Sequence, residues 1–350
     1  MARELARIGL PLIIAGRDGE QAAAFAASLG NENSGIAADA NRSADCRSAI
    51  AGASIAVRCA GPFHAANTEL LEACLDVGCH YADITDDRSY AARVRDFGHR
   101  FAEKGLAAIY GCSSLPGISG SLALAARAFH PERARVTLFI GNNNAKGHAA
   151  VSSLLGGLGQ PIRAPQGELR GFRDREIVPL PLPFGPRPVF NFESPDYDLL
   201  PELVGVSSVS VKVGFELKLA TYAFAALARL PIRFGKRTAW LLELPARVIS
   251  GLGSSGGVVM AELFAADGSV RRAAVIARAD GQRMAALPCA YAVQALGIGT
   301  SFRGAGTVYD LIGAKALLQR LSADGFDVLV DGPAVEFSPL VSSVSRKPGD

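Results

Sequence analysis

The sequence predicts an α/β protein in which a doubly wound parallel sheet is followed by a second, α+β domain with antiparallel strands. From Pro11 to about Ile140, short apolar runs alternate with helix-period segments. This order is typical of a parallel sheet that helices cover on both faces. After Ser121 the pattern changes, and apolar and polar residues alternate within several segments. Such alternation is typical of half-buried antiparallel strands.

The first part contains five predicted strand–helix units in succession. The predicted strands are residues 12–15, 35–39, 54–60, 80–85 and 106–111. The predicted helices are residues 19–30, 43–52, 67–78 and 87–105. Several of these helices end at a glycine, which is a common helix terminator.

The second part is less regular. The predicted strands are residues 134–140, 204–219, 258–264 and 269–277, and the last two are joined by an Asp-Gly hairpin turn. The predicted helices are residues 148–158 and 308–321. Residues 220–244 indicate either an amphipathic helical pair at a substrate cleft or dimer contact, or a helix hairpin that covers the sheet.

These patterns predict a division into domains. The predicted parts are an N-terminally incomplete nucleotide-binding domain (1–121), an α+β domain for substrate or dimerisation (122–300), a C-terminal helix returning to the first domain (301–341) and a disordered tail (342–350).

The composition excludes several functional classes. The 350 residues carry a formal net charge of +3, so no charge excess indicates nucleic acid or a membrane surface as partner. The six cysteines form no CxxC pair and no zinc-like spacing with histidine, which predicts no metal site and a reducing, cytoplasmic location. The uncharged stretches 105–126 and 284–302 contain glycine and proline, so we expect no membrane span.

The chain opens in the middle of a fold unit. Residues 1–8 are typical of the end of a helix, and residues 12–15 of the strand after it. In a doubly wound nucleotide-binding sheet, a first strand and a GxGxxG turn precede this helix and bind the pyrophosphate. No such strand and turn occur in the right place within the 350 residues. We expect the natural chain to extend upstream of Met1, and we expect the sheet to have a gap or an exposed edge at residues 12–15.

Arg17 and Asp18 stand directly after the second strand of this fold. The residue at this position faces the adenosine ribose, and an arginine there can pair with a 2′-phosphate. The position therefore predicts NADP rather than NAD as the cofactor. Because the chain is rich in arginine, an ordinary exposed side chain is the alternative.

Two groups of candidate residues follow at the carboxyl edge of the predicted sheet, where open α/β folds bind ligands. The first is the tight turn Ala60-Gly61-Pro62-Phe63, in which the glycine allows close approach of a cofactor. The second is Asp83, which lies within the next strand, where a carboxylate needs a partner. Asp83 is a candidate for cofactor binding or catalysis, and a structural hydrogen bond is the alternative.

The loop after the last of these strands contains Ser113, Ser114 and Pro116. It would face the nicotinamide, and the two hydroxyls could bind a carboxamide or a substrate oxyanion. A serine nucleophile is not indicated, since neither GxSxG nor a His/Asp pair is present. His64 and His148 are candidate proton donors, although single histidines are more often bystanders.

The runs LIIAGRD, VRCAGPF, HYADITDD and GCSSLPGISG, in this order and spacing, resemble the NADP-binding domain of the saccharopine dehydrogenase (saccharopine reductase) family. The resemblance is closest to its short bacterial members. It extends over about residues 1–160 and is looser to residue 320. It implies a Rossmann-like fold and an NADP-dependent oxidoreductase that exchanges hydride with a small carbonyl, imine or enoyl substrate held between two domains.

The candidate catalytic residues are Asp83, Ser114 and His148. The alternative function is that of a degenerate dinucleotide fold, a non-catalytic binding or scaffold protein, because the glycine-rich turn and a clear acid/base residue are missing. A homodimer is compatible with both functions.

Overall fold

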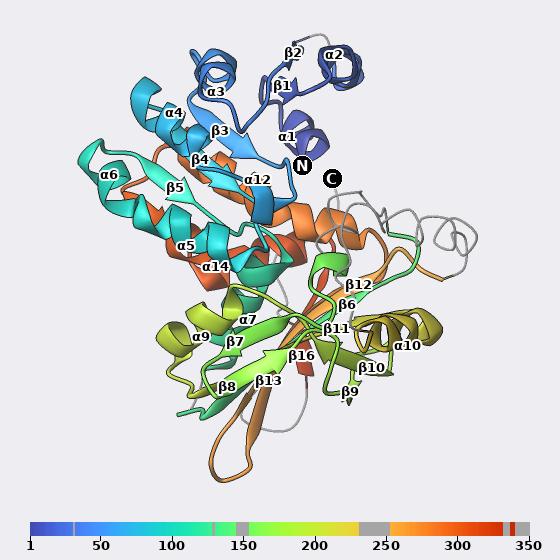
Figure 1. Ribbon diagram of the computed structural model, residues 1–350. Coiled ribbons are helices and arrows are strands. Elements are labelled where there is room, and N and C mark those ends of the chain that lie inside the picture. The colour runs from blue at the N-terminus through green and yellow to red at the C-terminus, as the bar shows by residue number, and fades with distance from the viewer. Residues whose placement is uncertain (31, 128–129, 145–153, 231–252, 332–336, 340–350) are drawn as a thin grey trace, which may run out of the picture.

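The computed structural model describes residues 1–30, 32–127, 130–144, 154–230, 253–331 and 337–339. Parallel strands and their helices form the upper part of the molecule in Figure 1, and a large mixed sheet forms the lower part. The predicted α/β class, with a parallel sheet followed by a sheet that contains antiparallel strands, is confirmed.

A four-stranded parallel sheet with the order β14-β5-β4-β3 forms the centre of the upper part. Its strands are β3 (Ile55–Arg58), β4 (His80–Asp83), β5 (Ala107–Ile109) and β14 (Gly304–Gly306). The helices along these strands are α3 (Ser43–Ala49), α4 (Glu69–Val77), α5 (Arg88–Asp96) and α6 (Gly98–Glu103). The sequence predicts three of these strands but not β14, which reaches the sheet from the far end of the chain.

The first strands of the chain form a separate sheet. β1 (Ile13–Gly16) pairs in parallel with β2 (Ser34–Ala37), and α2 (Gly19–Ala27) connects them. α1 (Ala2–Arg7) precedes β1. Within the described residues no strand joins β1 to β3, so the gap expected at residues 12–15 is present.

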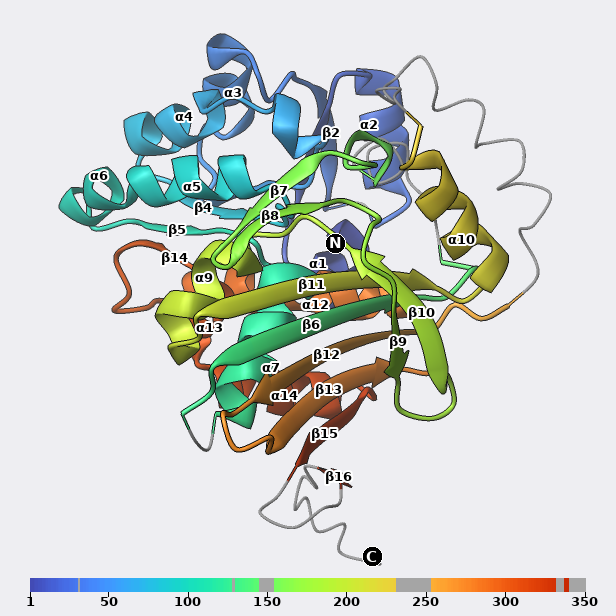
Figure 2. The same cartoon turned by 60° about the horizontal axis from the view of Figure 1, so that its bottom comes forward.

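The lower part is an eight-stranded sheet with the order β16-β15-β13-β12-β6-β11-β10-β9. Its strands are β6 (Arg133–Ile140), β9 (Glu176–Pro179), β10 (Pro186–Asn191), β11 (Ser208–Phe215), β12 (Gly257–Phe264), β13 (Val270–Ala277), β15 (Asp327–Asp331) and β16 (Phe337–Pro339). The hairpin of β7 (Pro161–Ala164) and β8 (Gly167–Arg170) crosses beside β11 (Figure 2).

Several predicted boundaries are wrong for local reasons. The predicted strand 204–219 is shorter, because α9 (Asp196–Val204) ends at the left-handed Gly205 (φ 79°) and α10 (Lys218–Leu227) begins soon after β11. β11 also runs parallel to β6, not antiparallel. The predicted helix 308–321 is broken at Gly313 (φ 83°) into α13 (Val308–Ile312) and α14 (Ala314–Ala323). Residues 148–153 of the predicted helix 148–158, much of 220–244 and the tail 342–350 lie outside the described residues, and residues 154–156 are helical as predicted.

Helices between the two sheets bury a common apolar core. α7 (Ser119–Ala126) and α12 (Gly281–Ile298) contribute to a cluster that also contains Ile109 of β5 and Val259 of β12. In Figure 2, α7 and α14 lie behind the mixed sheet. No helix in the described ranges is long and apolar enough to cross a membrane.

The packing of α2 on β2 yields a first prediction. A Cβ on Gly35 would lie 2.2 Å from the backbone nitrogen of Ala23, which cannot move without disturbing α2. Gly35→Ala should therefore loosen the β1–β2 unit, at a cost of roughly 1–3 kcal/mol or more. Faster amide hydrogen exchange in β1 and β2 would report this change. Gly156→Ala is the control, because a Cβ added there would meet nothing within 4 Å; equal exchange rates in both variants would contradict the prediction.

Candidate functional site

The carboxyl ends of β3, β4 and β5 meet at one edge of the parallel sheet, since all three strands run in the same direction. Each strand is followed by a loop that holds sequence-predicted residues. The turn after β3 leads into η1 (Phe63–Ala65), and the loop after β5 leads into η2 (Ser114–Ile118) and then α7. This edge is where open parallel sheets bind their ligands.

The turn after β3 is exposed at its first residues and buried at its last. Ala60 and Gly61 are exposed, so their backbone is accessible to a ligand. Pro62 is half-buried. Phe63 is 6% exposed, and its ring packs at a tilt of 50° against that of Tyr90, with 5.4 Å between the centroids. Phe63 therefore anchors the turn in the core, and the exposed backbone of Ala60 and Gly61 is the part of the turn that a ligand can reach.

Arg17 and Asp18 have different surroundings at the end of β1. Arg17 is exposed and makes no hydrogen bond or ion pair within the described part of the chain. Asp18 is the N-cap of α2, because its Oδ1 accepts a hydrogen bond of 3.0 Å from the backbone N–H of Gln21. The Asp18 carboxylate thus has a structural role. The N–H donors of the Arg17 guanidinium remain available to a ligand.

Asp83 is fully buried and joins β4 to the loop after β5. Its Oδ1 accepts hydrogen bonds from the backbone N–H groups of Thr85 (2.9 Å) and Gly111 (2.8 Å). Its Oδ2 accepts one from the Tyr81 hydroxyl (2.9 Å). The backbone oxygen of Asp83 also accepts a bond from Cys112 N (2.9 Å). These contacts favour the structural alternative for this residue.

A buried polar chain extends from Asp83 towards β3. The Tyr81 hydroxyl lies 2.9 Å from that of Tyr90, and Nη1 of Arg58 donates to the Tyr90 hydroxyl at 3.4 Å. Burial raises the pKa of Asp83 to about 6, and the hydrogen bonds from Thr85, Gly111 and Tyr81 and the Arg58 charge limit the rise. Because no part of Asp83 reaches solvent, the residue cannot contact a substrate in this conformation.

The loop after β5 leaves one serine hydroxyl without a partner. Gly111 has φ 62°, and a Cβ there would lie 2.5 Å from Cδ of Pro116, so the loop needs glycine at this position. Pro116 is buried against it. The Ser113 hydroxyl donates to the Leu115 carbonyl oxygen at 2.9 Å. The half-buried Ser114 has no hydrogen-bond partner for its side chain among the described residues.

A further carboxyl group at this edge, that of Asp86, is not among the site residues that the sequence predicts. Asp87 caps α5 by accepting from Tyr90 N at 2.8 Å, and Asp86 stands immediately before it. Burial raises the pKa of Asp86, the neighbouring Asp87 charge raises it further, and the nearby His64 lowers it. His64 is exposed on η1. The signal in the sequence was the acidic pair directly after a buried strand.

The mixed-sheet part is attached beside the same edge. Arg88, the first residue of α5, forms ion pairs with Asp198 of α9 and with Glu193 (3.4 Å). Arg95 of α5 pairs with Glu202 of α9 at 2.9 Å. These contacts hold α9 close to the loops that follow β4 and β5.

The remaining expectations concern His148 and metals. His148 lies outside the described residues, so its position relative to this edge is not defined. In the part of the chain that the structure describes, no three or more His, Cys, Asp or Glu side chains are arranged to hold a metal ion.

Comparison with known proteins agrees with the resemblance in the sequence. Residues 1–109 match the family model of the saccharopine dehydrogenase NADP binding domain. Apo histidine-tagged saccharopine dehydrogenase (L-Glu forming) from Saccharomyces cerevisiae has a similar fold, with a TM-score of 0.63 and 9% identity over 94% of this chain and 96% of that chain. A meso-dapdh mutant from Clostridium tetani E88 aligns with a TM-score of 0.39 and 13% identity over 86% of this chain and 94% of that chain. No curated protein sequence matches the chain.

The raised pKa of Asp83 predicts a pH dependence of stability. With a pKa of about 6 in the folded protein and 3.8 ordinarily, Asp83 binds its proton more tightly when folded. Its stabilisation is therefore complete below about pH 4 and is lost as the pH rises through 6, lowering the free energy of unfolding by roughly 2–3 kcal/mol. Asp83→Asn keeps a carbonyl oxygen for the two backbone donors. It should remove the part of the decrease in the free energy of unfolding that comes from ionisation of Asp83.

Urea unfolding of both proteins between pH 4.5 and 8 measures the difference. Asp96→Asn, on the exposed surface of α5, is the matched control and should follow the unsubstituted chain. Parallel stability curves for Asp83→Asn and the unsubstituted chain would show that Asp83 does not titrate in this range.

Proposed function

We propose, from the match of residues 1–109 with the family model of the saccharopine dehydrogenase NADP binding domain, that the chain is an NADP-dependent oxidoreductase. Hydride would pass between the nicotinamide and a small carbonyl, imine or enoyl substrate at the edge formed by the ends of β3, β4 and β5. The observation that carries the proposal is the exposed, unpaired Arg17 directly after β1 in this domain. The family supports a nicotinamide dinucleotide, and Arg17 supports the form with a 2′-phosphate.

Residues of the β1–β2 unit and of the edge formed by β3, β4 and β5 offer contacts for the two ends of such a cofactor. The Arg17 guanidinium would hold the 2′-phosphate, and the exposed Gly61 backbone would permit close approach of the dinucleotide. Ser114 would contact the nicotinamide end or a substrate oxygen. The bound cofactor supplies the hydride, while the protein supplies orientation and a proton.

The proton transfer requires a group with an accessible proton, and Asp83 is too deeply buried for this role. His64 and Asp86 are better candidates, because neither is fully buried and each follows a strand, β3 or β4, that ends at this edge. Burial raises the pKa of Asp86, which is the direction that a general acid requires. The Ser114 hydroxyl would stabilise negative charge that develops on the substrate oxygen.

A second candidate function is that of a non-catalytic binding protein with a degenerate dinucleotide fold. The observation that favours it concerns three side chains that the sequence predicts to bind the cofactor, namely those of Asp18, Asp83 and Ser113. Each of them forms a hydrogen bond within the protein. Fluorescence titration with NADPH, followed by absorbance assays with 2-oxo acids, imines and enoyl compounds, separates the two functions. Tight NADPH binding without turnover of any substrate class would favour the binding protein.

Arg17 should determine which dinucleotide binds. Arg17→Asp removes the charge-assisted pair with the 2′-phosphate and should raise the dissociation constant for NADPH roughly 10–100-fold. NADH lacks this phosphate, so its dissociation constant should change little. Fluorescence titration of both dinucleotides on the same variant measures the difference. Equal weakening of both would place the Arg17 side chain away from the phosphate.

Ser114 should act on the reaction more than on cofactor binding. Ser114→Ala removes one hydrogen-bond donor and should lower kcat roughly 10–100-fold, because the donor stabilises charge in the transition state. The dissociation constant for NADPH should change less. Ser89→Ala, an exposed serine on α5, is the control and should keep full activity. Unchanged kcat in Ser114→Ala would exclude this role.

A further inference from the structure

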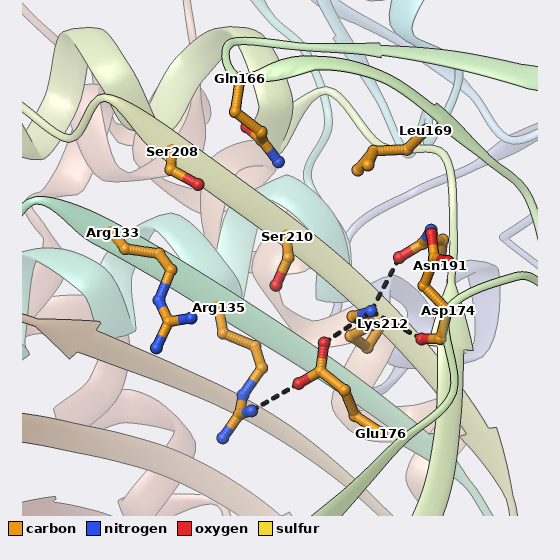
Figure 3. A pocket seen from close by; sticks show the side chains of 10 residues that line it. All are labelled: Arg133, Arg135, Gln166, Leu169, Asp174, Glu176, Asn191, Ser208, Ser210 and Lys212. Carbon is orange, nitrogen blue, oxygen red and sulfur yellow. Dashed lines mark hydrogen bonds and ion pairs between the residues drawn. The ribbon is translucent and has the colours of Figure 1, made fainter.

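A pocket of about 270 Å³ lies on the mixed sheet (Figure 3). Its lining residues all fall between positions 133 and 212, and residues 1–127 contribute none of them. The pocket therefore belongs to β6, β11 and the hairpins beside them. It is not part of the site proposed for the cofactor.

Strand register places cationic and hydroxyl side chains next to each other in this pocket. β6 and β11 are parallel, and Arg133 is paired with Ser208 while Arg135 is paired with Ser210. Side chains two residues apart on a strand point to the same face. Lys212 follows the two serines on that face, as Figure 3 shows.

The inner end of the pocket is a fixed network of ion pairs. Lys212 is 2% exposed, and its Nζ donates to the backbone oxygen of Asp174 (2.9 Å), to Asn191 Oδ1 (2.8 Å) and to Glu176 Oε1 (2.7 Å). Arg135 donates to Glu176 at 2.6 Å and to the fully buried Glu262 at 2.7 Å. The charges at this end are thus already paired and held in place.

The outer end keeps hydrogen-bond donors that have no partner. Arg133 is exposed; its guanidinium lies 4.1 Å from the centroid of the Phe264 ring and makes no ion pair within the described ranges. The hydroxyls of Ser208 and Ser210 also have no hydrogen-bond partner there. Of the three lining cations, Lys212 and Arg135 are paired with carboxylates, and Arg133 has no carboxylate partner among the described residues.

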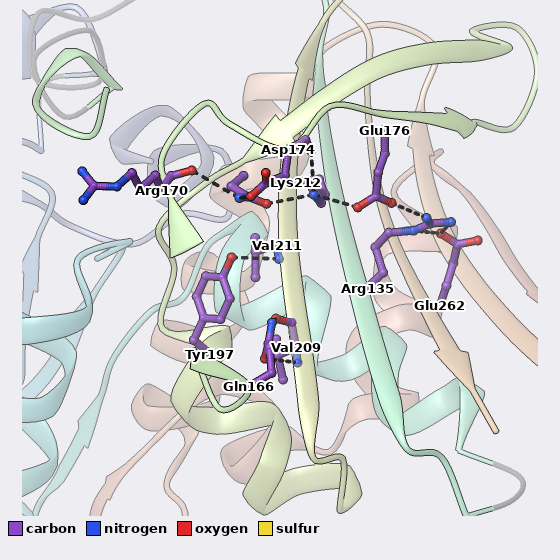
Figure 4. A network of polar contacts seen from close by, with 11 residues as sticks. Arg135, Gln166, Arg170, Asp174, Glu176, Tyr197, Val209, Val211, Lys212 and Glu262 are labelled. Atoms are coloured by element: carbon purple, nitrogen blue, oxygen red, sulfur yellow. Dashed lines mark hydrogen bonds and ion pairs between the residues drawn. The ribbon is translucent and has the colours of Figure 1, made fainter. Parts of the chain in front are cut away.

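The backbone edge of β11 beside the pocket is closed to a further strand. The side-chain amide of Gln166 accepts from Val209 N (3.1 Å) and donates to Val209 O (2.7 Å), and the Tyr197 hydroxyl accepts from Val211 N (3.2 Å), as Figure 4 shows. A peptide could not pair with β11 here, because these backbone groups are already bonded. The available contacts are therefore those of side chains with a small ligand.

We propose that this pocket binds a small organic anion, whose carboxylate or phosphate group is held by Arg133 and the hydroxyls of Ser208 and Ser210. An arginine and two hydroxyls together provide the donors that such oxyanions accept. The volume is slightly below the range of typical drug-sized pockets, which suits a small ligand. The rest of the ligand would extend towards Gln166 and Leu169, which line the same pocket.

Calorimetric titration of the full chain with inorganic phosphate and with succinate, at low ionic strength, tests the proposal. We expect at least one anion to bind, and Arg133→Gln to weaken that binding roughly tenfold or more. The double variant Ser208→Ala/Ser210→Ala should also weaken anion binding. Because this variant leaves every ion pair of the pocket intact, it tests the proposal even if Arg133→Gln fails to fold. Preference for phosphate or for succinate identifies the oxyanion class.

Two further variants distinguish this pocket from other cationic sites. Arg17→Gln changes the arginine proposed to hold the 2′-phosphate, and Arg278→Gln changes an exposed arginine directly after β13, so both variants should bind the anion as the unsubstituted chain does. The proposal is overturned if neither anion binds, if Arg133→Gln and the serine variant bind normally, or if Arg17→Gln abolishes the binding. None of these outcomes depends on whether the chain is an oxidoreductase.

Discussion

The apolar contact through α7 and α12 is the constraint on which the arrangement of the whole chain depends. One cluster of buried side chains includes Ile109 of the parallel sheet, Val136 and Val275 of the mixed sheet, and Leu122 and Leu296 of these two helices. Each buried aliphatic side chain of this size contributes roughly 1.5–3 kcal/mol. The two sheets therefore share a core, and the loops that follow β4 and β5 are held beside the second part of the chain.

Two buried carboxyl groups then fix the loop between β5 and α7. Asp83 bonds to Gly111 at the beginning of this loop, and Asp196 of α9 accepts from the hydroxyl of Ser119 (2.8 Å) at the first residue of α7. Burial raises the pKa of Asp196 to about 6, as it does that of Asp83. A loop held at both ends can present Ser114 in a defined place, which explains why fully buried aspartates lie so close to a candidate active site without facing it.

The sequence was informative wherever the signal is local. Apolar runs predict the strands from β1 to β5, and the position of Arg17 follows from the end of one of them. β14 was missed because its three residues, Gly304–Gly306, have no strand-like pattern and reach the sheet only after α12 brings the chain back. Whether β14 joins the parallel sheet depends on tertiary packing, which a local sequence pattern does not reveal.

The same distinction applies to the candidate sites. Whether Asp83 is structural or catalytic depends on Tyr81, Tyr90 and Gly111, and the last of these is 28 positions away in the chain. The anion pocket combines Arg133 with serines more than 70 positions later, so only strand register brings them together. Sequence reasoning could name polar residues at strand ends, but it could not determine which of them are already paired.

The ion pairs between the two parts of the chain are weaker determinants of their arrangement than the core. Arg95 and Glu202 are 41% and 64% exposed, and such pairs contribute only about 0–1 kcal/mol. The β1–β2 unit lacks comparable support from the core, because no residue of β1 is buried and Ile13 is 47% exposed. Arg17 is carried by this unit. Adjustment to a bound dinucleotide should therefore occur in β1 and β2, while the edge formed by β3, β4 and β5 keeps its position against the shared core.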